Sequence, residues 1–274
     1  MAISVVIPTV GRPELERAVA SVGRQTRLPE ELILVDNGTR PLPSTAILRE
    51  LAGHACALRV VSLPPLSGPG ICRNVGAWEA EGTHVAFLDD DDHFAEDYLD
   101  ATVETIRAQD PDVAYATKVF HGPDGDVRYR RLSEHPSSQW YRRLFLHKNR
   151  AVGGSNVTAR RSSFFDVGGF PPSMSSGQDR GFAMAALRAG LHVVPNDRAA
   201  VHCMDPAGTR ASAARRLPPL LWLTAEHWAQ FPRRDRALAV LRLTKVVVFP
   251  RRRPPSASGP RWSTEAPRSQ DERP

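Results

Sequence analysis

Four consecutive aspartates, Asp89 to Asp92, are the strongest candidate for a ligand-binding group in this chain. They follow an apolar stretch, residues 84–88, that reads as a buried strand, so their charge would collect at its carboxyl end. Adjacent carboxylates repel one another unless a cation offsets them, and oxygen-only ligands suit Mg²⁺ or Mn²⁺. The run equally fits a solvated acidic turn in which Asp91 or Asp92 caps a helix beginning near Phe94.

Asp36 and Arg73 are two further candidates for contacts to a nucleotide. Asp36 directly follows the apolar stretch 31–35, where its carboxylate would accept a hydrogen bond from a nucleobase N–H, although residues 36–38 are also a strong turn signal. Arg73 lies in the glycine-containing entry to an expected helix over 70–81, which suits an anion such as phosphate. The alternative there is a glycine-started helix with a surface arginine.

Asp179 and His202 are the candidates in the second half of the chain. Asp179 begins an expected helix over 179–190, where it would serve as a general base or, more simply, as a first-turn acid favoured by the helix dipole. His202 ends a short expected strand and would complete a coordination shell beside the aspartates, or be a structural histidine. No zinc-type ligand spacing accompanies it.

The elements that must position these residues alternate between strand and helix in the first half. Apolar β-rich runs predict strands over 3–7, 31–35, 58–63 and 84–88, and helical periodicity predicts helices over 13–25, 44–51, 70–81 and 95–109. This alternation predicts a parallel sheet covered on both faces. Ligands of such sheets collect at the carboxyl ends of the strands, where the aspartates lie.

The second half is less regular. Strands are expected over 113–120, 127–131, 155–159, 191–194 and 199–203, and helices over 139–146 and 179–190. Two longer helices, 211–231 and 234–249, are interrupted at prolines, and residues 251–274 predict a disordered tail.

Composition narrows the class of protein. The chain has 274 residues, 41% hydrophobic and 24% charged, as in soluble globular proteins, and no run long enough to cross a membrane. Its first residues read as a strand and not as a signal peptide, and three scattered cysteines favour a reducing compartment, so we expect a cytoplasmic protein.

The net charge of +6 is concentrated in the C-terminal third. No aromatic residues interleave with it as in nucleic-acid-binding surfaces, so no nucleic-acid partner is predicted. The basic and apolar residues of 233–253 fit either a peripheral contact with an anionic membrane surface or a helix packed on the domain with a solvated basic face.

The order of these motifs is more specific than any one of them. SVVIPTVGRPE, LILVDNG, GPGICRNVGAWEAEGTHVAFLDDDDHF, GGF, GQDRGFAMAALRAG and VHC follow one another in a way that resembles a family 2 glycosyltransferase of the GT-A fold, over residues 3 to 203. The resemblance implies an α/β fold with a mostly parallel, Rossmann-like central sheet flanked by helices. It further implies a nucleotide-sugar half (1–120), a small acceptor-side half (121–210), C-terminal helices (211–250) and a tail (251–274).

On the donor side, the resemblance also implies roles for single residues. Pro8 and Thr9 would line the nucleotide pocket, Asp36 would contact the base, and Arg73 would lie near the nucleotide. The aspartate run matches the family's DxD motif. Residues two apart on an extended strand face the same side, so Asp89 and Asp91 would point together. By the resemblance, Asp91 would ligate Mn²⁺ or Mg²⁺, Asp89 would lie near the ribose or a second-shell water, and Asp90 would also contact the nucleotide. The run is longer than the motif, so which carboxylates bind the ion is ambiguous by one position.

On the acceptor side, Gln178-Asp179 matches the family's ED motif, whose acid is the general base of inverting members. His202 matches a position that contacts the metal or the diphosphate in some relatives. No QxxRW motif is present, which argues against a processive polysaccharide synthase.

The predicted reaction is therefore an inverting transfer from a UDP-, dTDP- or GDP-sugar to an acceptor hydroxyl that enters near Trp140, Tyr141 and residues 153–156. One alternative is a nucleotidyltransferase acting on a sugar phosphate, but residues 9–13 hold one glycine and no lysine where such enzymes carry a phosphate loop. Another is an inactive nucleotide-binding partner protein, since fold does not guarantee function.

Overall fold

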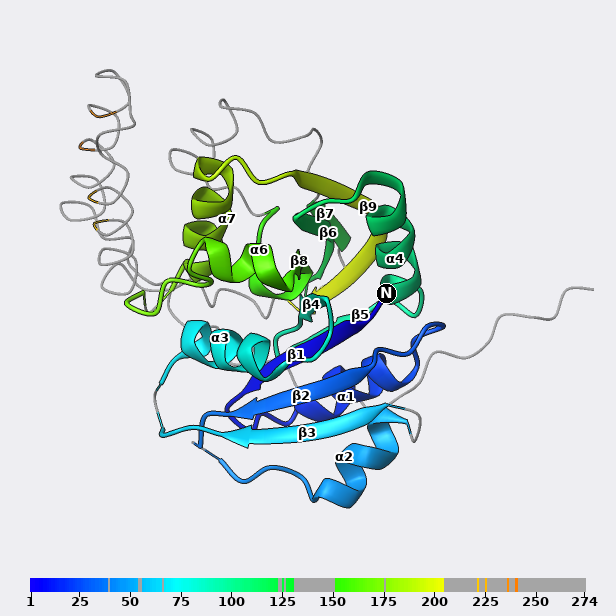
Figure 1. Ribbon diagram of the computed structural model, residues 1–274. Coiled ribbons are helices and arrows are strands. Elements are labelled where there is room, and N and C mark those ends of the chain that lie inside the picture. The colour runs from blue at the N-terminus through cyan, green and yellow to red at the C-terminus, as the bar shows by residue number, and fades with distance from the viewer. Residues whose placement is uncertain are drawn as a thin grey trace, which may run out of the picture.

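The protein is seen here as a computed structural model, shown in Figure 1. The structure describes residues 1–38, 40–53, 56–65, 67–122, 125, 127–130, 151–174 and 176–204, together with the single positions 221, 225, 236 and 240. The expected helices over 139–146, 211–231 and 234–249 and the expected tail over 251–274 lie outside these residues, apart from the single positions just named. Trp140 and Tyr141 also lie outside them.

One sheet runs through the described part of the chain, with strand order β3-β2-β1-β4-β8-β6-β9-β5 and β7 paired to β6. The first half supplies β1 (Ile3–Thr9), α1 (Leu15–Gly23), β2 (Glu31–Asp36), α2 (Thr45–Ala52), β3 (Ala57–Ser62), α3 (Pro69–Glu79) and β4 (His84–Phe87). Its four strands are parallel, as predicted. Every residue of β1 and β4 is buried, as expected for a parallel sheet with both faces covered.

The second half is mixed. It supplies β5 (Asp92–Phe94), α4 (Tyr98–Gln109), β6 (Val113–His121), β7 (Val127–Arg130), the 3₁₀ turn η1 (Gly154–Asn156), β8 (Val157–Arg160), α6 (Arg161–Asp166), α7 (Gln178–Arg188) and β9 (Val193–Met204). Strand β8, which lies in the predicted region 121–210, runs antiparallel to β4 and β6 at residues of the predicted region 1–120. The two predicted regions therefore share one sheet.

Two elements differ from the sequence prediction. The two short strands expected over 191–194 and 199–203 form one strand, β9, because β6 offers a continuous parallel partner and a bulge at Ala116/Thr117 absorbs the extra residues. Residues 92–94 pair with β9 as β5, and α4 begins only at Tyr98. The acidic run therefore does not cap that helix.

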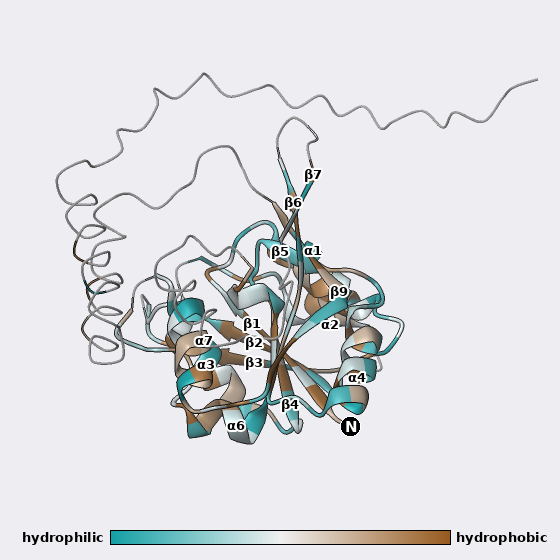
Figure 2. Ribbon diagram, turned by 90° about the horizontal axis from the view of Figure 1, so that it is seen from above, coloured by the Kyte–Doolittle hydropathy of each residue, from teal (hydrophilic) through white to brown (hydrophobic). Residues whose placement is uncertain are grey.

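The core lies in two layers, one on each face of the sheet. Alternate residues of the buried strands divide between them: Val6 and Ile33 belong to one layer, Ile7 and Leu34 to the other. The first layer includes residues of α3, α6 and α7, and the second includes residues of α1, α2 and α4. Figure 2 shows hydrophobic colour along the strands between these two sets of helices.

An aromatic cluster fixes the helices of the first layer. Phe87 of β4 lies 5.4 Å from Phe164 and 5.1 Å from Phe170 between ring centroids, and Phe182 of α7 lies 5.1 Å from Phe164. Such contacts anchor α6 and α7 over the end of β4, which the aspartates follow. Among the described helices, none combines the length and the apolar character that crossing a bilayer requires.

Candidate functional site

The carboxyl ends of β1, β2 and β4 meet at one edge of the sheet. Pro8 and Thr9 end β1 and pair in register with Val35 and Asp36 of β2, and the aspartate run follows β4 on the other side of β1. Pro8, Thr9 and Asp36, which were predicted to line a nucleotide pocket, are therefore adjacent in space. Parallel strands place their ligand-binding edge here.

Asp90 is fastened to the end of β1. One of its oxygens accepts hydrogen bonds from the Thr9 hydroxyl (2.8 Å) and the Val10 N–H (3.1 Å), and the other accepts from Arg12 (2.7 Å). The side chain is 3% exposed. These contacts make Asp90 a brace between β1 and the acidic turn, and they occupy both of its carboxylate oxygens.

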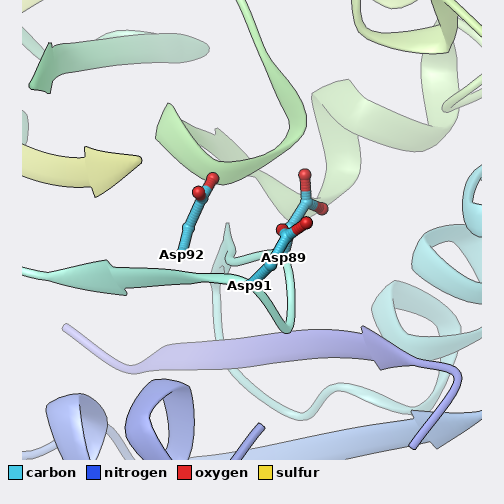
Figure 3. Close-up of side chains that lie close together, drawn as sticks. All are labelled: Asp89, Asp91 and Asp92. Carbon is cyan, nitrogen blue, oxygen red and sulfur yellow. The ribbon is translucent and has the colours of Figure 1, made fainter. Parts of the chain in front are cut away.

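The other three aspartates of the run gather with one another. Asp89, Asp91 and Asp92 each offer a carboxylate oxygen, and these oxygens all lie within 4.8 Å of one another (Figure 3). The turn closes through a hydrogen bond from the Asp92 N–H to the Asp89 carbonyl (3.1 Å), which brings Asp92 back toward its neighbours. Asp89 and Asp91 thus face the same side, as the alternation predicts, and Asp92 joins them in place of Asp90. Three hard oxygen donors at this spacing fit Mg²⁺ or Mn²⁺.

Asp92 is the most buried member of this aspartate cluster. It is 7% exposed and accepts hydrogen bonds from the Ser155 hydroxyl of η1 and from the Cys203 thiol of β9 (3.3 Å). Burial, reinforced by the charge of Asp89, raises the pKa of Asp92 to about 7, although Lys118 opposes the shift. Ser155 also accepts a hydrogen bond from the Asp89 N–H (3.3 Å), so η1 holds two of the three acids.

Arg73 holds the remaining side of Asp89. The guanidinium donates to the Asp89 carboxylate, lies 5.2 Å from the centroid of the Phe170 ring, and is 6% exposed. Burial alone would raise the pKa of Asp89, but the charge and hydrogen bond of Arg73 bring it below its ordinary value. Arg73 therefore lies at the aspartate cluster with a protein carboxylate as its partner, and its contact with a nucleotide stays a prediction.

Arg12 and Arg17 approach the cluster from the β1–α1 side. Arg12 bridges Asp90 and Asp91, donating to their carboxylates at 2.7 and 2.9 Å, and Arg17 donates to the Asp91 carbonyl at 2.9 Å. Asp91 is the most open of the three acids, with its side chain 49% exposed. Burial and the charge of Asp89 raise its pKa, and Arg12 lowers it in part. Sequence reasoning singled out neither arginine as a site residue.

Lys118 of β6 links the cluster to Asp179. Burial alone would lower the pKa of Lys118, but the acidic side chains around it raise that pKa. These side chains are Cys203, Asp92, Asp179 and Asp89. The charge of Asp179 also adds to burial in raising the pKa of Tyr115. Asp179, the predicted base, and two acids of the aspartate run, Asp89 and Asp92, therefore all influence the charge of one ammonium group.

The start of α7, which carries Asp179, is packed against α3. Gly177 begins the helix in the left-handed region (φ 77°), and Gln178 packs against Gly70 near the start of α3, where a Cβ would lie 3.0 Å from the Gln178 Cγ. The Gln178 amide also donates to the Met174 carbonyl (2.7 Å). The glycine predicted to help bind an anion in α3 thus permits close packing of α3 and α7.

Asp36 makes the turn contact that its sequence suggests. Its Oδ1 accepts a hydrogen bond from the Gly38 N–H (2.9 Å), and its carbonyl accepts from Leu63 (2.8 Å). The residue is partly exposed at the end of β2 beside Thr9. Contact with a nucleobase stays a prediction, compatible with this position.

The structure does not place His202 in the aspartate cluster that it was expected to complete. Its neighbour Cys203 pairs with Asp92 and contacts it, and because successive residues of a strand point to opposite faces, His202 points away from the cluster. Its ring lies 4.9 Å from that of His93 between centroids, and its Nδ1 lies 2.8 Å from the Nε2 of His121 in a hydrogen bond. We call these three residues the histidine stack.

Comparison with known proteins points to one family. Residues 4–166 match the family model described as glycosyl transferase family 2. A putative teichuronic acid biosynthesis glycosyltransferase TuaG of Bacillus subtilis is 35% identical over 194 residues, which cover 69% of this chain and 73% of that protein. Glycosyltransferase AglE of Haloferax volcanii is 26% identical over 210 residues, covering 75% and 68%.

The match to other relatives is partial. The chain spans 40% of the length of the uncharacterized glycosyltransferase YwdF of Bacillus subtilis, at 36% identity over 112 residues. In structure, residues 1–349 of S. aureus TarS in complex with UDP-GlcNAc superpose with a TM-score of 0.66 at 22% identity, over 90% of this chain and 72% of that one. This likeness extends the resemblance from sequence to fold.

Proposed function

This chain belongs to glycosyl transferase family 2 and has its GT-A fold, and from that premise we propose that it moves a sugar from a nucleoside-diphosphate sugar to an acceptor hydroxyl with inversion. One observation carries the proposal beyond the family. Asp89 and Asp92 of the three-carboxylate cluster and Asp179 at the start of α7 all influence the charge of Lys118, which supports placing the donor-side and base-side groups near one another.

The donor is a UDP-, dTDP- or GDP-sugar. Pro8, Thr9 and Asp36 form the nucleotide side, with Asp36 accepting the imino N–H that uracil, thymine and guanine each present. The TarS domain that superposes on this chain was solved with UDP-GlcNAc, which favours a uridine nucleotide. The acceptor is proposed only as a hydroxyl compound.

A divalent cation, Mn²⁺ or Mg²⁺, belongs at the aspartate cluster. Asp89, Asp91 and Asp92 would hold it, with Asp91 the most accessible ligand, and Asp90 and Arg73 would position the acids from behind. When bound, such an ion offsets the negative charge that grows on the leaving diphosphate.

Asp179 supplies the base. Its carboxylate removes the proton of the acceptor hydroxyl while that oxygen attacks the anomeric carbon on the face opposite the diphosphate. The bond from the anomeric carbon to the diphosphate oxygen breaks, the electron pair leaves with the diphosphate, and the configuration inverts.

The two alternative functions, a nucleotidyltransferase and an inactive nucleotide-binding protein, are both less well supported than a glycosyltransferase. Membership of a glycosyltransferase family disfavours a nucleotidyltransferase, which would release pyrophosphate from a nucleoside triphosphate. The presence of Asp179 and of three convergent carboxylates disfavours an inactive partner protein, because a binding-only protein has no need of both.

The test is a thermal-shift panel of UDP-, GDP- and dTDP-sugars with and without Mn²⁺, followed by a donor-hydrolysis assay with the sugar that binds. We expect one nucleotide class to raise the melting temperature, more so with Mn²⁺, and slow release of the nucleoside diphosphate. The control protein is the variant Asp97→Asn, which removes an exposed acid outside the cluster and should respond to the panel as wild type does. If no nucleotide sugar binds or is hydrolysed, the proposal fails.

A further inference from the structure

The aspartate cluster is already matched by positive groups of the protein. Arg73 pairs with Asp89, and Arg12 pairs with both Asp90 and Asp91. Asp92 pairs with no arginine among the described residues: it accepts hydrogen bonds from a hydroxyl and a thiol, and the cation that acts on it is Lys118. Charge repulsion among the aspartates, taken alone, therefore does not require a metal ion.

Two successive glycines make room for two of these cations. A Cβ at Gly153 would overlap the Lys118 ammonium, and a Cβ at Gly154 would overlap the Arg73 guanidinium. Neither glycine has a positive φ, so the backbone conformation does not demand glycine there. The position that a Cβ would take at each glycine is occupied by the end of a cationic side chain. The absence of a side chain at Gly153 and Gly154 therefore allows Lys118 and Arg73 to lie where they do.

We propose that Lys118 keeps the aspartate cluster close to charge balance, so that a divalent cation binds weakly to the free protein and tightly only together with the diphosphate of the donor. The inference rests on the proposed function and names the residue that makes its metal step depend on the donor. Lys118 is a positioning residue in this role.

A protonated lysine repels a divalent cation held by the same acids, and it attracts a diphosphate that arrives beside them. The diphosphate brings negative charge that the compensated cluster lacks, so the two ligands bind better together than apart. Replacing Lys118 by a neutral side chain should therefore change the two separate affinities in opposite directions, which simple loss of packing would not do.

The experiment titrates Mn²⁺ alone and UDP alone into the wild-type chain, Lys118→Met and Lys118→Arg, with free Mn²⁺ followed by electron paramagnetic resonance and UDP by calorimetry. We expect Lys118→Met to bind Mn²⁺ on the order of tenfold more tightly and UDP several-fold more weakly than wild type, from the loss of one charge near each ligand. Lys118→Arg keeps the charge and should stay near wild type.

A second variant covers the case in which Lys118→Met does not fold. Gly153→Ala leaves the lysine in the sequence but displaces its ammonium, and it should change both affinities in the same directions by a smaller factor. The inference is overturned if a variant that melts cooperatively binds Mn²⁺ no more tightly than wild type, or if both affinities fall together.

The same titrations distinguish failure of the proposed function from failure of the role of Lys118. In that case neither wild type nor variant takes up Mn²⁺ even with UDP present, and this inference falls with the metal site. If Mn²⁺ and UDP bind together to wild type but Lys118→Met leaves the affinity for Mn²⁺ alone unchanged, only the role of Lys118 is refuted.

Discussion

The two faces of the β5–β9 strand pair use neighbouring residues for opposite purposes. On one face, Asp92 and Cys203 join a cluster of acids balanced by cations, and on the other His93 and His202 stack with their charge suppressed. Burial and neighbouring histidines lower the pKa of His93 to about 4 and also lower that of His202. Residues adjacent in sequence thus belong to separate chemical environments.

The largest effect is expected from removing the proposed general base, Asp179. Asp179→Asn should reduce sugar transfer on the order of 10²- to 10⁴-fold, the usual contribution of a general base, while donor affinity changes little. Single-turnover transfer and UDP-sugar calorimetry measure the two quantities, and Asp97→Asn is the control. Equal losses of transfer and of donor binding would contradict the role of Asp179.

The next effect concerns the metal ligands. Asp91→Ala should remove the enhancement of UDP binding by Mn²⁺, because it takes away the most open carboxylate of the cluster. UDP binding without Mn²⁺ should persist, since Asp36 and Thr9 are untouched. A variant that still gains affinity from Mn²⁺ as wild type does would show that the ion is held elsewhere.

The comparison of faces is sharpened by His202→Gln. Since His202 points away from the cluster, this variant should keep the Mn²⁺ dependence of UDP binding within about twofold of wild type, on the premise that distant sites act independently. Calorimetry of UDP with and without Mn²⁺ measures it. Loss of the Mn²⁺ effect would break the separation of the faces and restore His202 as a ligand.

The smallest effect is on the pH dependence of stability. The pKa of His93 is about 4 in the folded protein against an ordinary 6.5, so the unfolded chain binds more protons than the folded protein between these pH values. The free energy of unfolding therefore decreases as the pH falls from 6.5 toward 4. His93→Gln should flatten that part of the profile of melting temperature against pH. An unchanged slope would mean that the histidine stack does not drive acid sensitivity.

The sequence predicted the fold best where strands are long, apolar and paired with near neighbours. The strands over 3–7, 31–35, 58–63 and 84–88 were all found with small shifts at their ends. Strand β5 was missed because it is three residues long and two of them are polar, and its partner lies more than 100 residues later in β9. β9 was expected as two pieces, but β6 pairs with it on both sides of the bulge and so makes it one strand.

The site was predicted only in part for a similar reason. Alternation correctly put Asp89 and Asp91 on one side, but it cannot describe the turn that follows, and that turn exchanges Asp90 for Asp92 in the cluster. Arg12 and Lys118 lie 79 and 26 residues from Asp91 and Asp92 respectively, and no local pattern marks either as a partner of the acids. Cationic partners so distant in sequence are identified only from the three-dimensional arrangement of the strands.

The most direct test of the central claim is an anomalous diffraction experiment on crystals grown with UDP and Mn²⁺, with data collected on the high-energy side of the manganese absorption edge. The proposed site predicts an anomalous peak within coordination distance of the Asp91 carboxylate and of at least one of Asp89 and Asp92. A peak at the histidine stack, or bound UDP with no peak at the aspartates, would contradict it.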